Sequence, residues 1–307
     1  MSADPAYYQL PDTTDKTVGR MVVGLCAFFV ALVAVVVLVF YNAQSIAQHI
    51  PFSAEKRFVR PYEKLISKVF GDLSEDSEVA DYLQRLADSL KDSMNISDDI
   101  ELNVHFVDVE EVNAFATLGG HIIIFGGLVN AMPDENSLAM VLAHEIAHVA
   151  NRDPIAAVSR GLALQMIAAF ITGSSTTTGD AFELVGGTGM AMFSRDQERQ
   201  ADIIALRALN SHYGHVGGYR TFFEKARDGA FDFSSEIDKE LEPGDEAKSD
   251  SGQENTLIAD TLAGWLASHP ETVERIELLD AEREIMQAGV GENTVMSSEV
   301  ENYLNSD

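Results

Sequence analysis

The sequence predicts an α+β protein, in which a mainly helical domain with a small β-sheet follows one transmembrane helix. Three observations lead to this prediction. An uncharged apolar run covers residues 21–41, apolar residues recur at helical spacing in several later segments, and alternating or hairpin-like segments are confined to residues 100–129. With 46% hydrophobic residues among 307, the chain can bury a sizeable core.

The charge of the chain restricts the partners it can have. A formal net charge of -28 argues against binding to nucleic acid or to an anionic membrane surface. Such acidity is typical of a domain that stays soluble in a salty or extracytoplasmic medium. The single cysteine, Cys26, rules out a disulfide within the chain.

The apolar run predicts a membrane anchor behind a polar tail at residues 1–20. The stretch "MVVGLCAFFVALVAVVVLVFY" at residues 21–41 lacks charge and matches the roughly 20 residues that cross a bilayer as a helix. It is longer than the apolar part of a signal peptide and lacks a small-residue cleavage site, so we expect it to be retained. Lys16 and Arg20 precede it and favour a cytoplasmic N-terminus, with the domain outside the cytoplasm.

Residues 77–288 are expected to form the main domain, after a juxtamembrane linker or helix at residues 42–76. Helical spacing predicts a helix at residues 77–92, and alternation predicts a strand within residues 100–108. Residues 112–129 read as two strands joined at Gly119-Gly120, a hairpin signal. A helix is expected after Pro133, with Asp134 or Glu135 complementing its N-terminus.

Residues 154–173 form a second apolar stretch that contains Arg160. Its uninterrupted part is too short to span a bilayer, so we interpret it as a buried or membrane-grazing helix, with a re-entrant segment as the alternative. The rest of the chain is expected to comprise a helix at residues 193–210, an acidic loop insertion at 232–256, helices at 256–268 and 271–289, and a C-terminal tail at 289–307.

The motif His144-Glu145-x-x-His148 lies inside the helix predicted after Pro133. On a helix the two histidines share one face, with Cβ atoms roughly 5–6 Å apart, so both can reach one tetrahedral Zn²⁺. Glu145 would point beside the metal, where it can take a proton from a water molecule. The motif therefore predicts a catalytic metal site, since burying these groups in an ordinary core would be costly.

A catalytic zinc requires a third protein ligand and an open position. The residues that directly follow the motif, "VANRDPIAA", contain no further histidine, so a later glutamate is expected. Glu198 is the favoured candidate and Glu183 the competitor. Asp202 lies one helical turn after Glu198, placed to accept the second N–H of a ligating histidine and fix its orientation.

Three motifs in order, "HEIAH", "SRDQERQAD" and "SHPETVERI", resemble the HtpX-like zinc metallopeptidases, which include the mitochondrial Oma protease, periplasmic quality-control proteases and the type I CaaX prenyl protease. The resemblance covers about residues 65–285. It implies a gluzincin fold with one Zn²⁺ per chain, His144, His148 and Glu198 as ligands, and Glu145 as general base. It also gives His269 a catalytic role, either steadying the transition state or filling the open site in a resting form.

The resemblance implies a membrane-anchored endopeptidase acting on polypeptides, with misfolded membrane or envelope proteins as the expected substrates. One anchor and a long acidic insertion depart from HtpX itself and favour a bacterial inner-membrane protein with an extracytoplasmic domain. The alternative is a membrane-tethered quality-control adaptor or holdase with a structural or latent zinc site. Arg275 also matches the family pattern, where we expect a structural ion pair. The sequence does not specify an oligomeric state.

Overall fold

The computed structural model describes residues 16–57, 77–172, 193–228 and 272–305. Its elements are, in order, α1 (Lys16–His49), α3 (Glu78–Ser93), β1 (Asn103–Val107), β2 (Ala114–Ala116), η1 (Leu118–Gly120), β3 (His121–Phe125), α4 (Gly126–Ala131), α5 (Glu135–Asn151), α6 (Asp153–Thr172), α8 (Arg195–Tyr213), α9 (Thr221–Arg227), α12 (Thr272–Met286) and α13 (Ser298–Leu304). The predicted α+β class, mainly helical with a small sheet, is confirmed.

The sheet has three strands in the order β1-β3-β2, with β3 in the centre. β3 runs parallel to β1 and antiparallel to β2, so β2 lies at an edge and forms the predicted hairpin with β3. Gly119 and Gly120 make the turn with φ values of 77° and 81°, a conformation that favours glycine. A Cβ atom at Gly120 would lie 2.0 Å from the carbonyl oxygen of Glu101, so this position excludes any larger residue.

Helix α5 forms the centre of the domain and begins where the sequence predicts. Asp134 caps it by accepting a hydrogen bond from the backbone N–H of Ser137 at 2.9 Å. All residues from Asn136 to Val149 are buried, because α3, α8 and the sheet surround the helix. A helix that is buried on all sides is expected to be apolar all round, and the polar exceptions in α5 therefore indicate a site.

Helix α8 packs along α5 and starts with a complete capping box. The Ser194 side chain accepts from the backbone of Gln197, and the Gln197 side chain accepts from the backbone of Ser194. Gly214 ends the helix in the left-handed conformation, with a φ of 76°. The capping box fixes the first turn of α8, which carries Glu198.

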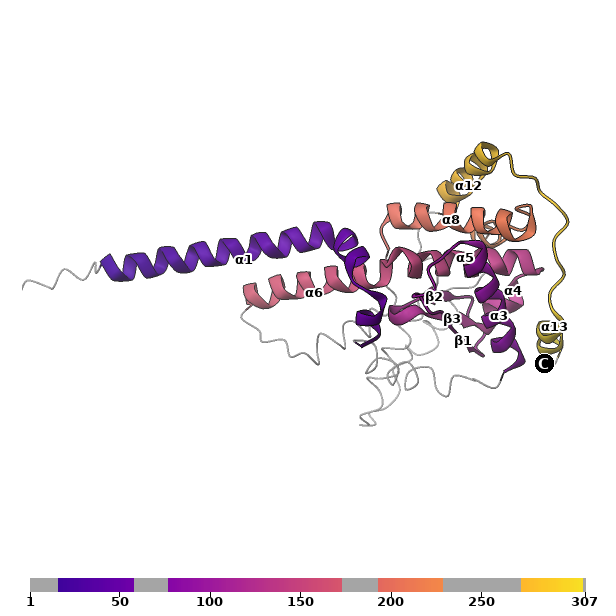
Figure 1. Ribbon diagram of the computed structural model, residues 1–307, viewed down its shortest axis with the longest axis horizontal. Coiled ribbons are helices and arrows are strands. Elements are labelled where there is room, and N and C mark those ends of the chain that lie inside the picture. The colour runs from indigo at the N-terminus through magenta and orange to yellow at the C-terminus, as the bar shows by residue number, and fades with distance from the viewer. Residues whose placement is uncertain (1–15, 58–76, 173–192, 229–271, 306–307) are drawn as a thin grey trace, which may run out of the picture.

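Helices α1 and α6 lie side by side and project away from the rest of the domain (Figure 1). Within the described part of the chain, α1 has the one stretch long and apolar enough to cross a membrane, Val18–His49. The helix therefore extends the predicted anchor at residues 21–41 in both directions. Its last turns are buried against α6, where Ala43 and Ala47 contact Ala156.

The C-terminal residues pack back onto the domain. α12 lies against α8 and α9, and α13 lies against α3. Val300 and Met296 are buried, and the backbone N–H of Glu135 donates to the carbonyl of Thr294 at 3.1 Å. The C-terminal segment thus touches the first turn of α5. The predicted acidic loop at 232–256, the helix expected at 256–268 and His269 lie outside the described residues.

Candidate metal centre

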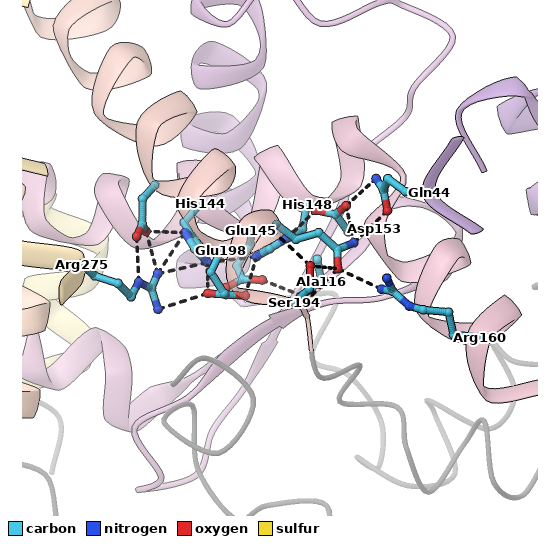
Figure 2. Close-up of polar contacts among 12 residues, drawn as sticks. Gln44, Ala116, His144, Glu145, His148, Asp153, Arg160, Ser194, Glu198 and Arg275 are labelled. Carbon is cyan, nitrogen blue, oxygen red and sulfur yellow. Dashed lines mark hydrogen bonds and ion pairs between the residues drawn. The ribbon is translucent and has the colours of Figure 1, made fainter. Parts of the chain in front are cut away.

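Helix α5 presents His144 and His148 on one face, one turn apart. Their Nε2 atoms lie 3.0 Å from each other, and the two residues are 1% and 0% exposed. Figure 2 shows both rings and the Glu198 carboxylate pointing toward one another. Glu198 comes from the first turn of α8, so two helices far apart in the sequence meet at this point.

The three side chains fit a zinc ion by both chemistry and spacing. The Glu198 oxygens lie 3.4 Å from His144 Nε2 and 3.4 Å from His148 Nε2. Four tetrahedral ligand atoms at about 2.0–2.1 Å from zinc lie about 3.3 Å apart, close to these separations. Two imidazoles and one carboxylate are also the ligand set found in catalytic zinc sites. Of the two candidates for the third ligand, the structure places Glu198 here, whereas Glu183 lies outside the described residues.

Each histidine has a carboxylate behind it that orients its ring. His144 Nδ1 lies 3.0 Å from Asp202 Oδ1, and His148 Nδ1 lies 2.7 Å from Asp153 Oδ2. Both aspartates are fully buried. Because a carboxylate fixes the proton on Nδ1, Nε2 of each ring is left to bind a metal. The sequence predicts such a role for Asp202, and the structure adds Asp153.

Asp153 is a site residue that sequence reasoning missed. It follows the second histidine by five residues and lies at the start of α6, directly after the left-handed residue Arg152 that ends α5. The chain reversal at Arg152, with a φ of 65°, brings Asp153 back toward His148. The sequence does show an acidic residue just after the helix that carries the motif. Whether its side chain points toward His148, however, depends on the chain reversal at Arg152.

Arg275 of α12 is part of the same buried cluster. Its guanidinium donates to both oxygens of Asp202, at 2.6 and 2.7 Å, and lies 3.1 Å from a Glu198 oxygen. It also stacks over the ring of Phe223, 4.8 Å from the centroid. Figure 2 shows it approaching from the side opposite Asp153. Arg275 therefore balances the negative charge that the carboxylates bring into the interior.

These contacts shift the pKa values of the cluster. Burial alone would lower the pKa of His148, but hydrogen bonds to Asp153 and Glu198 outweigh burial and raise it to about 9 in the metal-free chain. Burial also opposes protonation of His144, yet Asp202 and Glu198 raise its pKa. Burial would raise the pKa of Asp202, whereas Arg275 and His144 outweigh it and lower that pKa. The Asp202 carboxylate is thus held ionised beside Arg275 and His144.

Glu145 lies between the two histidines in α5 and is completely buried. Its Oε2 accepts a hydrogen bond from the backbone N–H of Ala116 at 2.8 Å. Ala116 belongs to β2, the edge strand, so this bond joins the HExxH turn to the edge of the sheet (Figure 2). The geometry puts a carboxylate beside the candidate metal site and next to a strand edge.

The middle and C-terminal part of the chain, residues 75–283, matches the profile of peptidase family M48. This match covers more than half of the sequence. The chain belongs to peptidase family M48. Family membership confirms the predicted resemblance and the predicted class of enzyme, a zinc metallopeptidase.

Three known proteins are similar to part of this chain. The beta-barrel assembly-enhancing protease of Escherichia coli (strain K12) is 31% identical in an alignment of 143 residues that covers 41% of this chain and 28% of that protein. The mitochondrial metalloendopeptidase OMA1 of Schizosaccharomyces pombe is 26% identical over 174 residues, 56% of this chain and 51% of that protein. The metalloprotease YcaL of Escherichia coli (strain K12) is 31% identical over 157 residues, 47% of this chain and 60% of that protein. The chain thus spans between 28% and 60% of the length of these relatives.

Three other polar residues, at the end of α8 and just after it, have partners away from the metal cluster. Tyr213 donates to Glu135 at the first turn of α5, and His212 Nδ1 lies 3.0 Å from the hydroxyl oxygen of Ser93. His215 Nδ1 accepts from the backbone N–H of Gly217 at 3.0 Å. In this M48 chain these side chains therefore support the fold at the far end of α5.

Proposed function

We propose that this M48 protein is a membrane-anchored, zinc-dependent endopeptidase. The observation that carries the proposal is the meeting of His144, His148 and Glu198 at zinc-ligand spacing, with Glu145 on the same helical turn. His144, His148 and Glu198 would hold one Zn²⁺, and Asp202 and Asp153 would orient the imidazoles through Nδ1. When bound, the zinc supplies a Lewis acid that polarises a peptide carbonyl and acidifies a water molecule.

Glu145 acts as the general base in this proposal. Its carboxylate takes a proton from the attacking water and then passes it to the nitrogen of the departing amine. The hydrogen bond from the Ala116 N–H holds one of its oxygens at 2.8 Å and thereby fixes the direction of the carboxylate. Complete burial keeps bulk water away from this proton transfer.

We infer that substrate binds along β2. Within the described chain β2 pairs with β3 on one side, and no second strand is assigned to its other side. An extended peptide can add to such an edge through backbone hydrogen bonds, with its side chains in alternate pockets. Because the Ala116 N–H touches Glu145, a peptide on this edge would lie close to the catalytic base.

Membrane or envelope proteins that have misfolded are the substrates that fit this arrangement. The apolar helix α1 would hold the domain beside a bilayer, and the net charge of -28 disfavours nucleic acid as a partner. One relative is named as a protease that enhances β-barrel assembly and another as a mitochondrial metalloendopeptidase. We place the domain on the extracytoplasmic side of a bacterial inner membrane, as Lys16 and Arg20 favour.

The test pairs zinc content with casein cleavage for the full chain in detergent micelles. Wild type is expected to bind about one zinc per chain and to cleave casein. Glu145→Gln is expected to keep the zinc and to lose at least about 100-fold in cleavage, because it loses the base. Glu284→Gln removes the same charge from an exposed position on α12 and should match wild type. Full activity of Glu145→Gln would contradict the proposed mechanism.

The same assay separates the enzyme from the alternative, an adaptor or holdase with a structural or latent zinc site. Zinc bound by both wild type and Glu145→Gln, without cleavage by either, would favour that alternative.

His269→Ala, compared with wild type in the same assay, tests the proposed catalytic role of His269. Reduced cleavage at unchanged zinc content supports a role in the transition state, whereas increased cleavage indicates that His269 closes the site in a resting form.

A further inference from the structure

The end of α1 reaches the metal centre through a short chain of hydrogen bonds. Gln44 lies just beyond the apolar run, and its Nε2 donates to Asp153 Oδ1 at 2.7 Å and to the Asn151 carbonyl at 2.8 Å. The other oxygen of Asp153 lies 2.7 Å from His148 Nδ1. One side chain therefore separates the membrane helix from a histidine that faces the metal site (Figure 2).

Gln197 closes this chain into a network. Its Nε2 donates to Asp153 Oδ1 at 2.7 Å and to Gln44 Oε1 at 2.8 Å. Its Oε1 accepts from Arg160 of α6 at 2.9 Å and from the backbone of Ser194 at 2.9 Å. Gln197 also directly precedes Glu198 in the first turn of α8. The network thus joins α1 to α5 and α8, the two helices that carry the three proposed metal ligands.

Burial makes this network specific. Asp153 is fully buried, Gln197 is 6% exposed, and the half-buried Gln44 side chain bonds to both of them. With both amides donating to Oδ1, the carboxylate is fixed with Oδ2 toward His148. Without Gln44, Asp153 would keep one of these donors and could rotate, because a buried carboxylate turns toward whatever donors remain.

A second contact fixes the segment that follows α1. Glu55, in the short helix at residues 52–57, pairs with Arg152 at 2.6 Å and accepts from the backbone N–H of Gly119 at 2.7 Å. Arg152 also donates to the carbonyl of Ile50 at 3.0 Å. Glu55 and Arg152 are 4% and 7% exposed. The anchor segment is therefore attached both to the end of the HExxH helix and to the turn beside the edge strand.

We propose that Gln44 is a positioning residue of the metal centre, so that α1 forms part of that centre as well as anchoring the chain. Gln44 acts through Asp153 on the ring of His148 and does not itself contact the metal site. A shift or tilt of α1 in the bilayer would then alter the orientation of His148 and weaken zinc binding. The inference rests on the proposed function only in placing zinc at His144, His148 and Glu198.

The experiment compares two substitutions at Gln44 in the full chain with a control on the same helix. Gln44→Leu removes both the donor and the acceptor. Gln44→Glu keeps the size of the side chain and the oxygen that accepts from Gln197, but it loses the donor to Asp153 and to the Asn151 carbonyl and places a second carboxylate beside Asp153. Asn42→Ala is the control, because Asn42 is exposed and, within the described chain, donates to the Leu38 carbonyl of its own helix.

Zinc affinity is measured by competition with a chelator, and the visible absorption of the Co²⁺-substituted protein reports the ligand geometry. Both Gln44 variants should bind zinc more weakly by about fivefold, which is less than the roughly 10–100-fold loss expected when a ligand's own partner is removed. Both variants should also shift the Co²⁺ absorption band. If Gln44 only stabilised the fold, the band would stay unchanged. Asn42→Ala should match wild type within about twofold.

The outcomes separate the two proposals. Unchanged zinc affinity and an unchanged Co²⁺ spectrum in both Gln44 variants, beside a wild type that binds zinc and cleaves casein, overturn the inference and leave the proposed function standing. A lower unfolding temperature without those two changes overturns it as well, since Gln44 would then only stabilise the fold. A wild-type chain that binds no zinc overturns both proposals.

Discussion

Arg275 in α12 donates to both oxygens of Asp202 in α8, at 2.6 and 2.7 Å, and neither side chain reaches solvent. The pair closes the candidate metal centre on the side away from the membrane helix. Arg275 is also 3.1 Å from Glu198, so one cation serves two buried carboxylates.

Arg275→Met is expected to lower the free energy of unfolding by about 3–5 kcal/mol, because it leaves buried carboxylates without their cation. Arg85→Met is the control. Arg85 pairs with Glu299 at 2.9 Å and joins α3 to α13, and neither side chain is buried, with 60% and 34% exposed. Removing that pair should cost at most about 1 kcal/mol. Urea unfolding of the zinc-free proteins measures both values, and equal losses would contradict the assigned role of Arg275.

Asp153→Asn should weaken zinc binding by about 10–100-fold, because the ring of His148 loses the carboxylate that fixes its proton on Nδ1. Asp228→Asn makes the same change at an exposed residue that follows α9 and should have no effect. Chelator competition measures the two affinities. If Asp153→Asn bound zinc as tightly as wild type, Asp153 would not orient His148.

Zinc affinity should rise with pH up to about pH 9. The pKa of His148 is raised to about 9 in the metal-free chain, so its ring is protonated at neutral pH and must release that proton before it binds a metal. Affinity is then expected to rise about tenfold per pH unit for each proton displaced. Calorimetry in buffers of different ionisation enthalpy counts the protons. No proton release at pH 7 would show that His148 is already neutral.

The raised pKa of His148 also makes the stability of the metal-free fold depend on pH, in a definite direction. A raised pKa means that the folded state binds the proton more tightly than the unfolded state, whose ordinary value is 6.5. This stabilisation is fully present below pH 6.5 and is lost as the pH rises through about 9. Unfolding of zinc-free protein at pH 6 and pH 9 checks the direction, with zinc-loaded protein as the comparison.

Gly120→Ala should destabilise the domain by more than about 2 kcal/mol, because the new Cβ would lie 2.0 Å from the Glu101 carbonyl in addition to the strained φ of 81°. Gly214→Ala has a similar φ of 76° but open space around the new atom. It should cost only about 1 kcal/mol. Thermal unfolding compares the two variants, and equal losses would mean that the close approach at Gly120 is relieved by movement of the chain.

The sequence predicted the parts of the site that depend on local spacing. His144 and His148 are four residues apart in a helix, so their common face follows from helical geometry alone. The helix start near Asp134 follows from a capping residue, and the hairpin follows from Gly119-Gly120. The end of α8 at Tyr213 lies three residues beyond the predicted end at 210. Glu198 was favoured as a glutamate of a later helix and through the resemblance to zinc metallopeptidases, and Asp202 by its place one turn after Glu198.

The parts that the sequence did not predict depend on how separate helices dock. Asp153 reaches His148 only because the chain reverses at Arg152. Gln44 reads as one polar residue after an apolar run, and its contact with Asp153 requires α1 to lie beside α6. Arg275 was expected to form an ion pair, but its position beside the metal cluster depends on the packing of α12 against α8.

The burial of α5 on every side has a consequence for hydrogen exchange. Residues 136–149 have no solvent-facing position, so their amide hydrogens can reach water only when the surrounding helices and sheet separate. Exchange at the amides of His144 and His148 should therefore follow global opening of the domain rather than local fraying. Metal binding at this helix would slow exchange throughout the protein core, so isotope uptake in α5 would record site occupancy without any substrate.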